Sequence, residues 1–163
     1  MTVALGCDHR GFAAKQELLT LLQTLGYQIK DFGCHSFLGV DYPDIAFPLA
    51  VAVAAQQYDV GILIGCSGMG MTMVANKVPG IRAATAYDEF TARCARENFH
   101  CNIIGVGADL VSAVDIRKIV EAFLQATVVA GRHARRIEKL RQIEKTVARD
   151  FVANSKPPVL SRV

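Results

Sequence analysis

Runs of aliphatic residues alternate along the chain with longer segments of helical spacing. Several of these runs hold almost no polar residue, which is typical of strands covered on both faces. The predicted strands cover residues 3–7, 27–32, 60–65, 81–86 and 102–107. Strands that alternate with helices predict an α/β fold, an open, doubly wound parallel five-stranded sheet with helices on both faces.

The helical segments carry their own start and stop signals. Gly26 is expected to close the first helix, and Asp88 is expected to cap the helix that contains Phe90 and Cys94. The last helical segment, 131–148, carries an apolar stripe of Ile137, Leu140, Ile143 and Val147. Because this helix is additional to a complete sheet, we expect it to pack on a partner subunit in a homodimer.

Length and composition indicate one domain, expected over residues 1–148 and followed by an irregular tail at 149–163. The net charge of +3 is small, and much of the excess lies between Arg132 and Arg149. This favours a local anionic ligand over nucleic acid. The absence of a signal-peptide pattern and of a membrane-length apolar run predicts a cytoplasmic protein without a membrane partner.

The cysteine and histidine residues narrow the chemistry. Five cysteines without CxxC spacing predict free thiols in a reducing compartment. The four histidines are scattered, so no metal site is expected. The glycine-rich GCSGMGM (65–71) is neither a complete dinucleotide fingerprint nor a Walker loop, and no cofactor is expected.

In an open parallel sheet, ligands bind beyond the carboxyl ends of the strands. Asp8 and His9 follow the first strand directly, where they suit sugar hydroxyls or a phosphate, although Asp8 could instead cap a helix. Gly68 and Gly70 follow the third strand and let backbone N–H groups converge on an anion. Cys66 in the same turn is expected to have a lowered pKa, or else to be an inert buried cysteine.

Two further segments hold candidate ligands. Arg132 and Arg136 lie four residues apart on one helical face, which suits a phosphate monoester, although a solvated basic surface is the alternative. Tyr42 in DYPD either lines the pocket or is a turn residue before Pro43.

The motifs together resemble one family, that of ribose-5-phosphate isomerase B and galactose-6-phosphate isomerase, over about residues 2–145. The resemblance rests on GCDHRGFAAK, DYPD, GILI…SGMGM…ANKVPGIRAA, ARENFHCNIIGVG and GRHARRIEKL, in this order. It implies a Rossmann-like fold and a homodimer, or a tetramer formed by two dimers, with the site between subunits. It also implies metal-free interconversion of an aldose and a ketose phosphate through a cis-enediolate.

Carried over by position, the resemblance implies a role for each candidate residue. Asp8 holds the sugar, His9 lies near the substrate and Tyr42 lines the pocket. Ser67 matches a small hydroxyl residue, and the amides of Gly68, Met69 and Gly70 stabilise the enediolate oxygen. Arg132 and Arg136 of the other subunit hold the phosphate.

The sequence departs from the family pattern at several of these positions. Gly65 stands where relatives carry a thiol base, and the cysteine follows one residue later, at Cys66. Met71 occupies the position at which another branch of the family has a glutamate base. Asp109 occupies the position at which relatives have a phosphate-binding arginine.

Two further departures concern the opening of the sugar ring. Asn98 occupies the position of the histidine that opens the sugar ring in relatives. Phe99 occupies the next position, which in relatives is usually an asparagine near the substrate. Cys66 as base and His100 as ring-opening group are therefore the candidate replacements.

The expected function is isomerisation of a phosphorylated sugar of the ribose 5-phosphate/ribulose 5-phosphate type. Two alternatives follow from the departures. One is an isomerase of a different sugar phosphate, such as a tetrulose 4-phosphate, which needs no ring opening. The other is a catalytically silent sugar-phosphate-binding relative, or the partner subunit of an active homologue.

Overall fold

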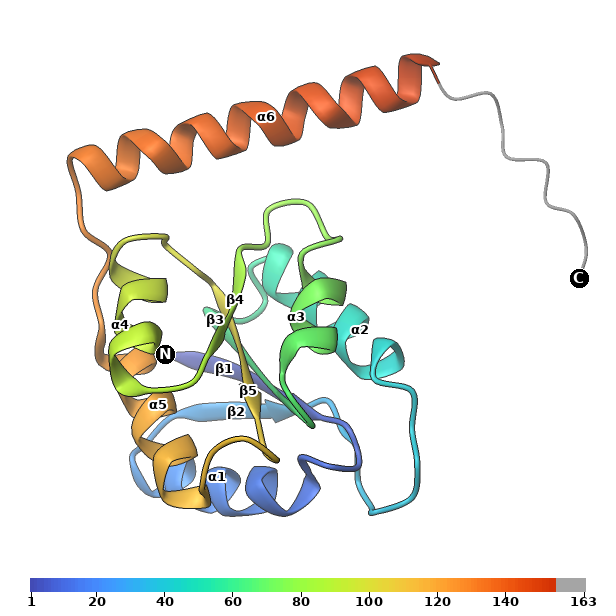
Figure 1. Cartoon of the computed structure of the whole chain (residues 1–163), viewed down its shortest axis with the longest axis vertical. Helices are drawn as coiled ribbons and strands as arrows, with labels where there is room; N and C mark the ends of the chain where they lie inside the picture. Colours follow the sequence, from blue (N-terminus) through green and yellow to red (C-terminus); the bar gives the residue numbers. More distant parts are fainter. Residues whose placement is uncertain (155–163) are drawn as a thin grey trace, which may run out of the picture. The chain divides into compact units, whose positions relative to one another are not determined.

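The computed structural model describes residues 1–154, with side chains as far as Arg149. Met1–Val129 form one compact unit, and a second begins at Ala130. The second unit contains one long helix, α6 (Arg132–Asn154) (Figure 1). The tail expected to be irregular from 149 is therefore helical to Asn154, because ARDFVAN contains no glycine or proline to end the helix. Residues 155–163 lie outside the described part.

The first unit is built on a parallel sheet in the order β2-β1-β3-β5-β4. Its strands are β1 (Thr2–Cys7), β2 (Gln28–Asp31), β3 (Val60–Gly65), β4 (Ala83–Ala86) and β5 (Ile103–Gly107). The predicted α/β class and all five predicted strands are confirmed. Since the strands are parallel, all their carboxyl ends lie at one edge, and β1, β3 and β5 are neighbours there.

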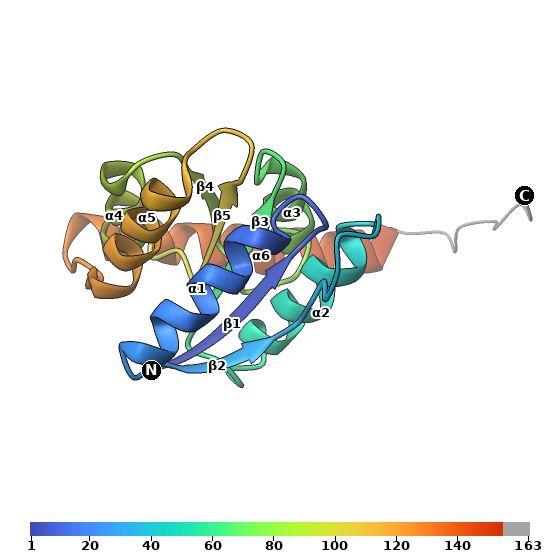
Figure 2. The same ribbon diagram turned by 90° about the horizontal axis from the view of Figure 1, so that it is seen from below.

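Helices cover both faces of the sheet (Figures 1 and 2). They are α1 (Phe12–Thr24), α2 (Pro43–Ala54), α3 (Met69–Ala75), α4 (Glu89–Glu97) and α5 (Ala113–Gln125). Apolar residues of α1, α4 and α5 pack against one set of strand residues, and those of α2 and α3 pack against the other. Successive side chains of β1, β3 and β5 alternate between these two cores, which explains why these strands are almost wholly apolar.

Two predicted helix boundaries are confirmed. Gly26 follows the end of α1 with φ of +81°, a conformation that glycine adopts without steric cost. The Asp88 carboxylate accepts the backbone N–H of Thr91 at 2.6 Å and its hydroxyl at 2.8 Å, which caps α4. This cap fixes the chain direction as it leaves β4.

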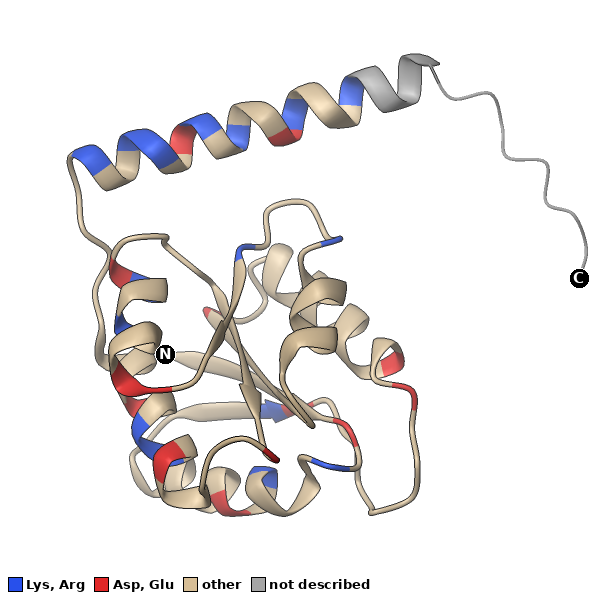
Figure 3. Ribbon diagram, in the orientation of Figure 1, with Lys and Arg blue, Asp and Glu red and all other residues tan. Residues whose placement is uncertain are grey.

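The surface of α6 is strongly basic, because Lys and Arg follow one another along the helix and outnumber Glu (Figure 3). In the expected apolar stripe, Leu140, Ile143 and Val147 are exposed. Packing of this stripe on a partner subunit stays a prediction. Among residues 1–154 we find no helix with the length and apolar character needed to span a membrane.

Candidate active site

A cavity of about 150 Å³ lies at the carboxyl edge of the sheet. It is lined by Asp8, Tyr42, Gly65, Cys66, Ser67, Gly68, Gly70 and Met71. The lining comes from three segments: the end of β1, the start of α2 and the turn between β3 and α3. The structure therefore brings together Asp8 and the glycine-rich turn, which the sequence had placed at one edge, and adds Tyr42 to the lining.

The glycine-rich turn is pressed against the end of β5. Gly68 has φ of +77°, and a Cβ there would lie 2.9 Å from backbone atoms of Val106. Backbone hydrogen bonds from Ala108 to the Gly65 carbonyl (2.7 Å) and from Asp109 to the Cys66 carbonyl (3.1 Å) hold the two segments together. A side chain at position 68 would therefore clash with the backbone of β5, and the positive φ also favours glycine there.

Ser67 and Tyr42 also line the cavity beside the turn. The Ser67 hydroxyl accepts the N–H of Met69 at 3.3 Å, which orients it within the first turn of α3. The ring of Tyr42 lies across the turn, because a Cβ on Gly70 would be 3.0 Å from the ring carbon that bears the hydroxyl. The side chain of Tyr42 is 42% exposed, so it forms the outer rim of the cavity.

Asp8 is almost fully buried, with 8% of its surface exposed. Its Oδ1 accepts the backbone N–H groups of Arg10 (2.8 Å) and Gly11 (3.1 Å). The residue that caps α1 is Gly11, so Asp8 orders the turn before the helix and is not its N-cap. Its other oxygen, Oδ2, faces Gly65: a Cβ on that glycine would lie 2.8 Å away.

Cys66 has a different environment from the one predicted. It is exposed, so it is not a buried inert cysteine. A hydrogen bond to the Asp109 carboxylate raises the pKa of the Cys66 thiol, and slight burial and the negative charge of Asp109 act in the same direction. The expected lowering of its pKa by the start of α3 is therefore wrong. This acidic neighbour overrides the helix terminus, and α3 has only seven residues.

Asp109 is also paired with Arg10 across the edge of the sheet. The Arg10 Nη2 and Nε atoms lie 2.8 Å and 3.0 Å from Asp109 Oδ2. The hydrogen bonds from Cys66 and Arg10 together lower the pKa of Asp109. Arg10, Asp109 and Cys66 thus form a polar chain at the edge of the cavity, which sequence reasoning missed because its members follow three different strands, β1, β5 and β3.

His9 is held away from the cavity lining. Its Nδ1 accepts the backbone N–H of Val40 at 3.4 Å, so the imidazole is tied to the loop before α2. The predicted place of His9 beside the substrate stays a prediction.

The other predicted catalytic positions lie at the opposite edge of the sheet within one subunit. Asn98 ends α4, and Phe99 and His100 follow it before β5 begins, so all three are at the amino end of that parallel strand. His100 Nε2 donates to the Val129 carbonyl at 3.0 Å, and Phe99 is 60% exposed. A single subunit does not bring these residues to the cavity of Asp8.

Arg132 and Arg136 lie in the first turns of α6, within the second unit. Their spacing places both guanidinium groups on one face of the helix, as the sequence predicted. Arg132 Nε donates to His133 Nε2 at 3.3 Å. Their predicted contact with a phosphate stays a prediction.

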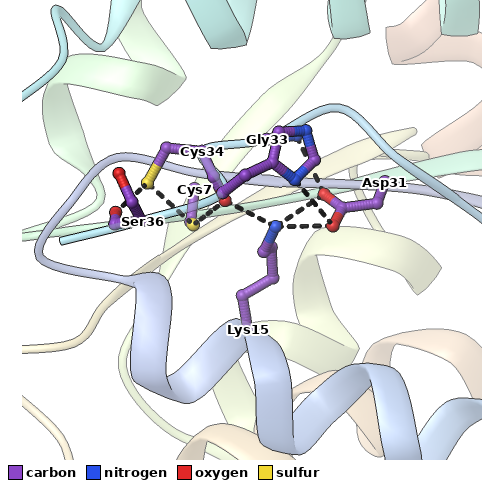
Figure 4. Close-up of polar contacts among 7 residues, drawn as sticks. Cys7, Lys15, Asp31, Gly33, Cys34 and Ser36 are labelled. Carbon is purple, nitrogen blue, oxygen red and sulfur yellow. Dashed lines mark hydrogen bonds and ion pairs between the residues drawn. The ribbon is translucent and has the colours of Figure 1, made fainter. Parts of the chain in front are cut away.

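A buried lysine, Lys15, lies in a polar network with Asp31 and Cys34 (Figure 4). Lys15 Nζ is fully buried and donates to both Asp31 oxygens, at 2.7 and 2.6 Å, and to the Cys34 carbonyl at 2.7 Å. The loop it holds bonds to the end of β1, from Cys7 N–H to the Gly33 carbonyl (2.6 Å) and from Cys34 N–H to the Cys7 carbonyl (2.7 Å). This network fixes the strand end from which Asp8 projects.

The thiol of Cys7, which belongs to this network, is poorly suited to react as a thiolate. The sulfur atoms of Cys7 and Cys34 lie 3.8 Å apart, and both residues are free thiols. Burial and the neighbouring Cys34 raise the pKa of Cys7 to about 12. The sequence signal for the network was a lysine beside Ala14 on the apolar face of the first helix.

Fold and cavity define a Rossmann-like α/β protein with a small pocket, lined in part by the carboxylate of Asp8, at the carboxyl edge of its sheet. Residues 3–140 match the family model described as Ribose/Galactose Isomerase, and the chain belongs to this family. No group of three metal-ligating side chains occurs in the described part of the chain.

The relatives match nearly the whole chain. It is 37% identical to ribose-5-phosphate isomerase B of Escherichia coli, over 88% of this chain and 96% of that protein. It resembles the structure of ribose-5-phosphate isomerase B from Clostridium thermocellum with a TM-score of 0.87 and 40% identity, covering 90% of this chain and 99% of that one. The Mycoplasma genitalium enzyme with bound ribulose 5-phosphate gives a TM-score of 0.85 and 37% identity, covering 88% and 96%.

Proposed function

We propose that this protein is an aldose–ketose isomerase that interconverts ribose 5-phosphate and ribulose 5-phosphate. The observation that carries the proposal is its membership of the family over nearly its full length, together with a cavity at the expected edge of the sheet. The relatives whose names specify ribose 5-phosphate match over about nine-tenths of the chain. The pocket accordingly takes a small phosphorylated sugar.

The cavity has the groups that such a reaction requires. Removal of a proton next to a carbonyl places negative charge on the carbonyl oxygen, so donors must face that oxygen while a base faces the carbon. The backbone amides of the turn at 68–70 and the Ser67 hydroxyl would supply the donors. Tyr42 would close the outer rim over the sugar, and Arg132 and Arg136 would hold the phosphate.

We further propose that each complete site is shared by two subunits. Asn98, Phe99 and His100 lie at the edge of the sheet opposite to Asp8, and therefore cannot reach the cavity of their own chain. A second copy arranged with two-fold symmetry would present this edge to the cavity, and the reverse contact would form at the same time. In that arrangement His100 and Asn98 assist ring opening. The predicted location in the cytoplasm stays a prediction.

The direct test is a coupled assay of the purified chain with ribose 5-phosphate, run beside a tetrulose 4-phosphate. We expect turnover of ribose 5-phosphate without added metal or cofactor. Turnover of the tetrulose phosphate alone would reassign the substrate, consistent with Asn98 at the ring-opening position. If neither is turned over while ribose 5-phosphate still raises the melting temperature, the chain is a binding protein or a partner subunit.

A further inference from the structure

The first observation concerns the titratable side chains of the cavity. Among the residues that line it, Asp8, Tyr42 and Cys66 carry groups that can exchange a proton. An isomerase needs a group that accepts a proton from carbon at neutral pH and then returns it. Carboxylates and thiolates act in this way, so the choice lies between Asp8 and Cys66.

Cys66 is poorly suited to accept a proton. Its thiol is hydrogen bonded to Asp109, and this contact favours the protonated form of the sulfur. Arg10, which would favour the thiolate, is itself engaged with Asp109 at 2.8 Å. The sulfur therefore stays a thiol at neutral pH, where only the thiolate is an effective base.

Asp8 has the geometry of an oriented base. The amides of Arg10 and Gly11 both bond to Oδ1, which fixes the plane of the carboxylate. No donor among residues 1–149 bonds to Oδ2, which is the oxygen that faces Gly65. One oxygen is thus anchored to the backbone and the other is available at the cavity.

The glycine at 65 is what creates space for this oxygen. A Cβ at position 65 would lie 2.8 Å from Asp8 Oδ2 and 3.3 Å from Met71 Sδ, so any side chain there would displace the carboxylate. Positions 65 and 71, where the sequence departs from the family pattern, therefore both border the space into which Oδ2 points. Met71 is 2% exposed and forms an apolar wall behind it.

We propose that Oδ2 of Asp8 is the base of the isomerisation; this assignment rests on the proposed function. In the open-chain aldose, Oδ2 takes the proton from C2. The C–H electron pair becomes the C1=C2 double bond, and the C1=O π electrons move to O1, giving the cis-enediolate. The protonated carboxyl then returns the proton to C1 while the O2 proton passes to O1, which leaves a C2 carbonyl and a C1 hydroxymethyl group. No external oxidant or reductant is needed.

The test uses Asp8→Asn, which retains Oδ1 as acceptor for the two amides and removes the basic oxygen. We expect kcat for ribose 5-phosphate to fall at least about 100-fold, since a general base contributes at least this factor. KM should change less than about threefold, because proton abstraction occurs only in the transition state. In D₂O, deuterium uptake at C1 of the product, read by NMR, should be lost in parallel.

The matched control is Asp109→Asn, which neutralises a second carboxylate at the same edge outside the cavity lining. Its kcat should stay within about threefold of the unmodified protein, whereas a thiolate base at Cys66 would become more active once Asp109 is neutralised. A gain of activity in Asp109→Asn would overturn the assignment. It would also be overturned if Cys66→Ala lost deuterium uptake while Asp8→Asn retained it.

A second variant leaves Asp8 in place. Gly65→Ala puts a methyl group against Oδ2 and should lower kcat at least about tenfold in protein that still unfolds cooperatively, because a misplaced base loses its alignment. Full kcat in Gly65→Ala would also overturn the role of Asp8. If Asp8→Asn retains turnover, only the assignment of Asp8 as the base is wrong. If the unmodified chain neither binds nor converts ribose 5-phosphate, the proposed function itself is wrong.

Discussion

The thiol of Cys66 and the carboxylate of Asp109 share a hydrogen bond at the edge of the sheet, where β3 and β5 lie side by side. This contact raises the pKa of a cysteine that stands in a glycine-rich turn, where a reactive thiolate was predicted. An acidic residue that follows the neighbouring strand thus favours the protonated form of the thiol in this motif.

Removal of the Asp109 charge should make Cys66 more reactive. In Asp109→Asn the contact that raises the pKa is lost, so a larger fraction of Cys66 is thiolate at neutral pH and alkylation by iodoacetamide becomes faster. Mass spectrometry of the peptide that contains Cys66 gives the rate, and Asp44→Asn on α2 is the control carboxylate. An equal or slower rate in Asp109→Asn would show that Asp109 does not hold the proton on the thiol.

The buried Lys15 should be important for stability. Lys15→Met leaves the Asp31 carboxylate and the Cys34 carbonyl without their shared donor, and we expect a loss of about 3 kcal/mol in the free energy of unfolding. Urea denaturation measures it. Lys30→Met, on an exposed position of β2, is the matched control and should change stability by less than about 0.5 kcal/mol. Equal effects of the two variants would contradict the role of the network.

Substitution of Gly68 should destabilise the protein more than substitution of Gly26, which has a similar backbone conformation but no neighbouring atoms. Gly26→Ala meets no atom within 4 Å, so only its φ of +81° opposes the substitution, at a cost of about 1 kcal/mol. Gly68→Ala adds a Cβ 2.9 Å from the backbone of Val106, and it should cost at least about 2 kcal/mol more and abolish activity. Similar unfolding free energies for the two variants would argue against the tight packing of this turn on β5.

Asp59 should contribute to the loss of stability in acid. The N–H of Thr2 at 2.6 Å and its hydroxyl at 3.1 Å lower the pKa of Asp59 below its ordinary value of 3.8. Its contribution is therefore complete above the unfolded-state value and is lost as the pH falls through the lower folded-state value.

Asp59→Asn should accordingly show a shallower fall in unfolding free energy between about pH 5 and about pH 3 than the unmodified protein. Thr2→Val, which keeps the backbone N–H and removes the hydroxyl, should give an intermediate slope. A slope in Asp59→Asn as steep as in the unmodified protein would exclude this contact as a source of the acid sensitivity.

A site shared between subunits predicts that two inactive variants restore each other. Mixing Asp8→Asn with the double variant Arg132→Ala/Arg136→Ala forms hybrids in about half of the dimers, each with one intact site of two, so about a quarter of full activity returns. Mixing Asp8→Asn with Gly68→Ala is the control, because both changes affect the cavity of their own chain. Recovery in the control alone, or in neither mixture, would exclude the shared site.

The alternation of apolar runs and helical segments determined the fold class and all five strands, because strand and helix periodicities are local properties of a sequence. It also placed Asp8 and the turn at 65–71 at one edge, since parallel strands end together. The motifs that carry the family resemblance are likewise contiguous in the chain. The end of α6 was misplaced because the segment after Arg149 has no strong stop signal.

The tertiary structure alone decided which side chains meet across that edge. The pairing of Cys66 with Asp109 depends on β3 and β5 being neighbours, and the pairing of Lys15 with Asp31 depends on how α1 lies against β2. The approach of Asp8 Oδ2 to Gly65 likewise joins two strands. Contacts of this kind depend on strand order and on distances of a few ångströms, whereas periodicity carries information only along the chain. They nevertheless raise the pKa of Cys66 and leave Asp8 as the oriented carboxylate of the cavity.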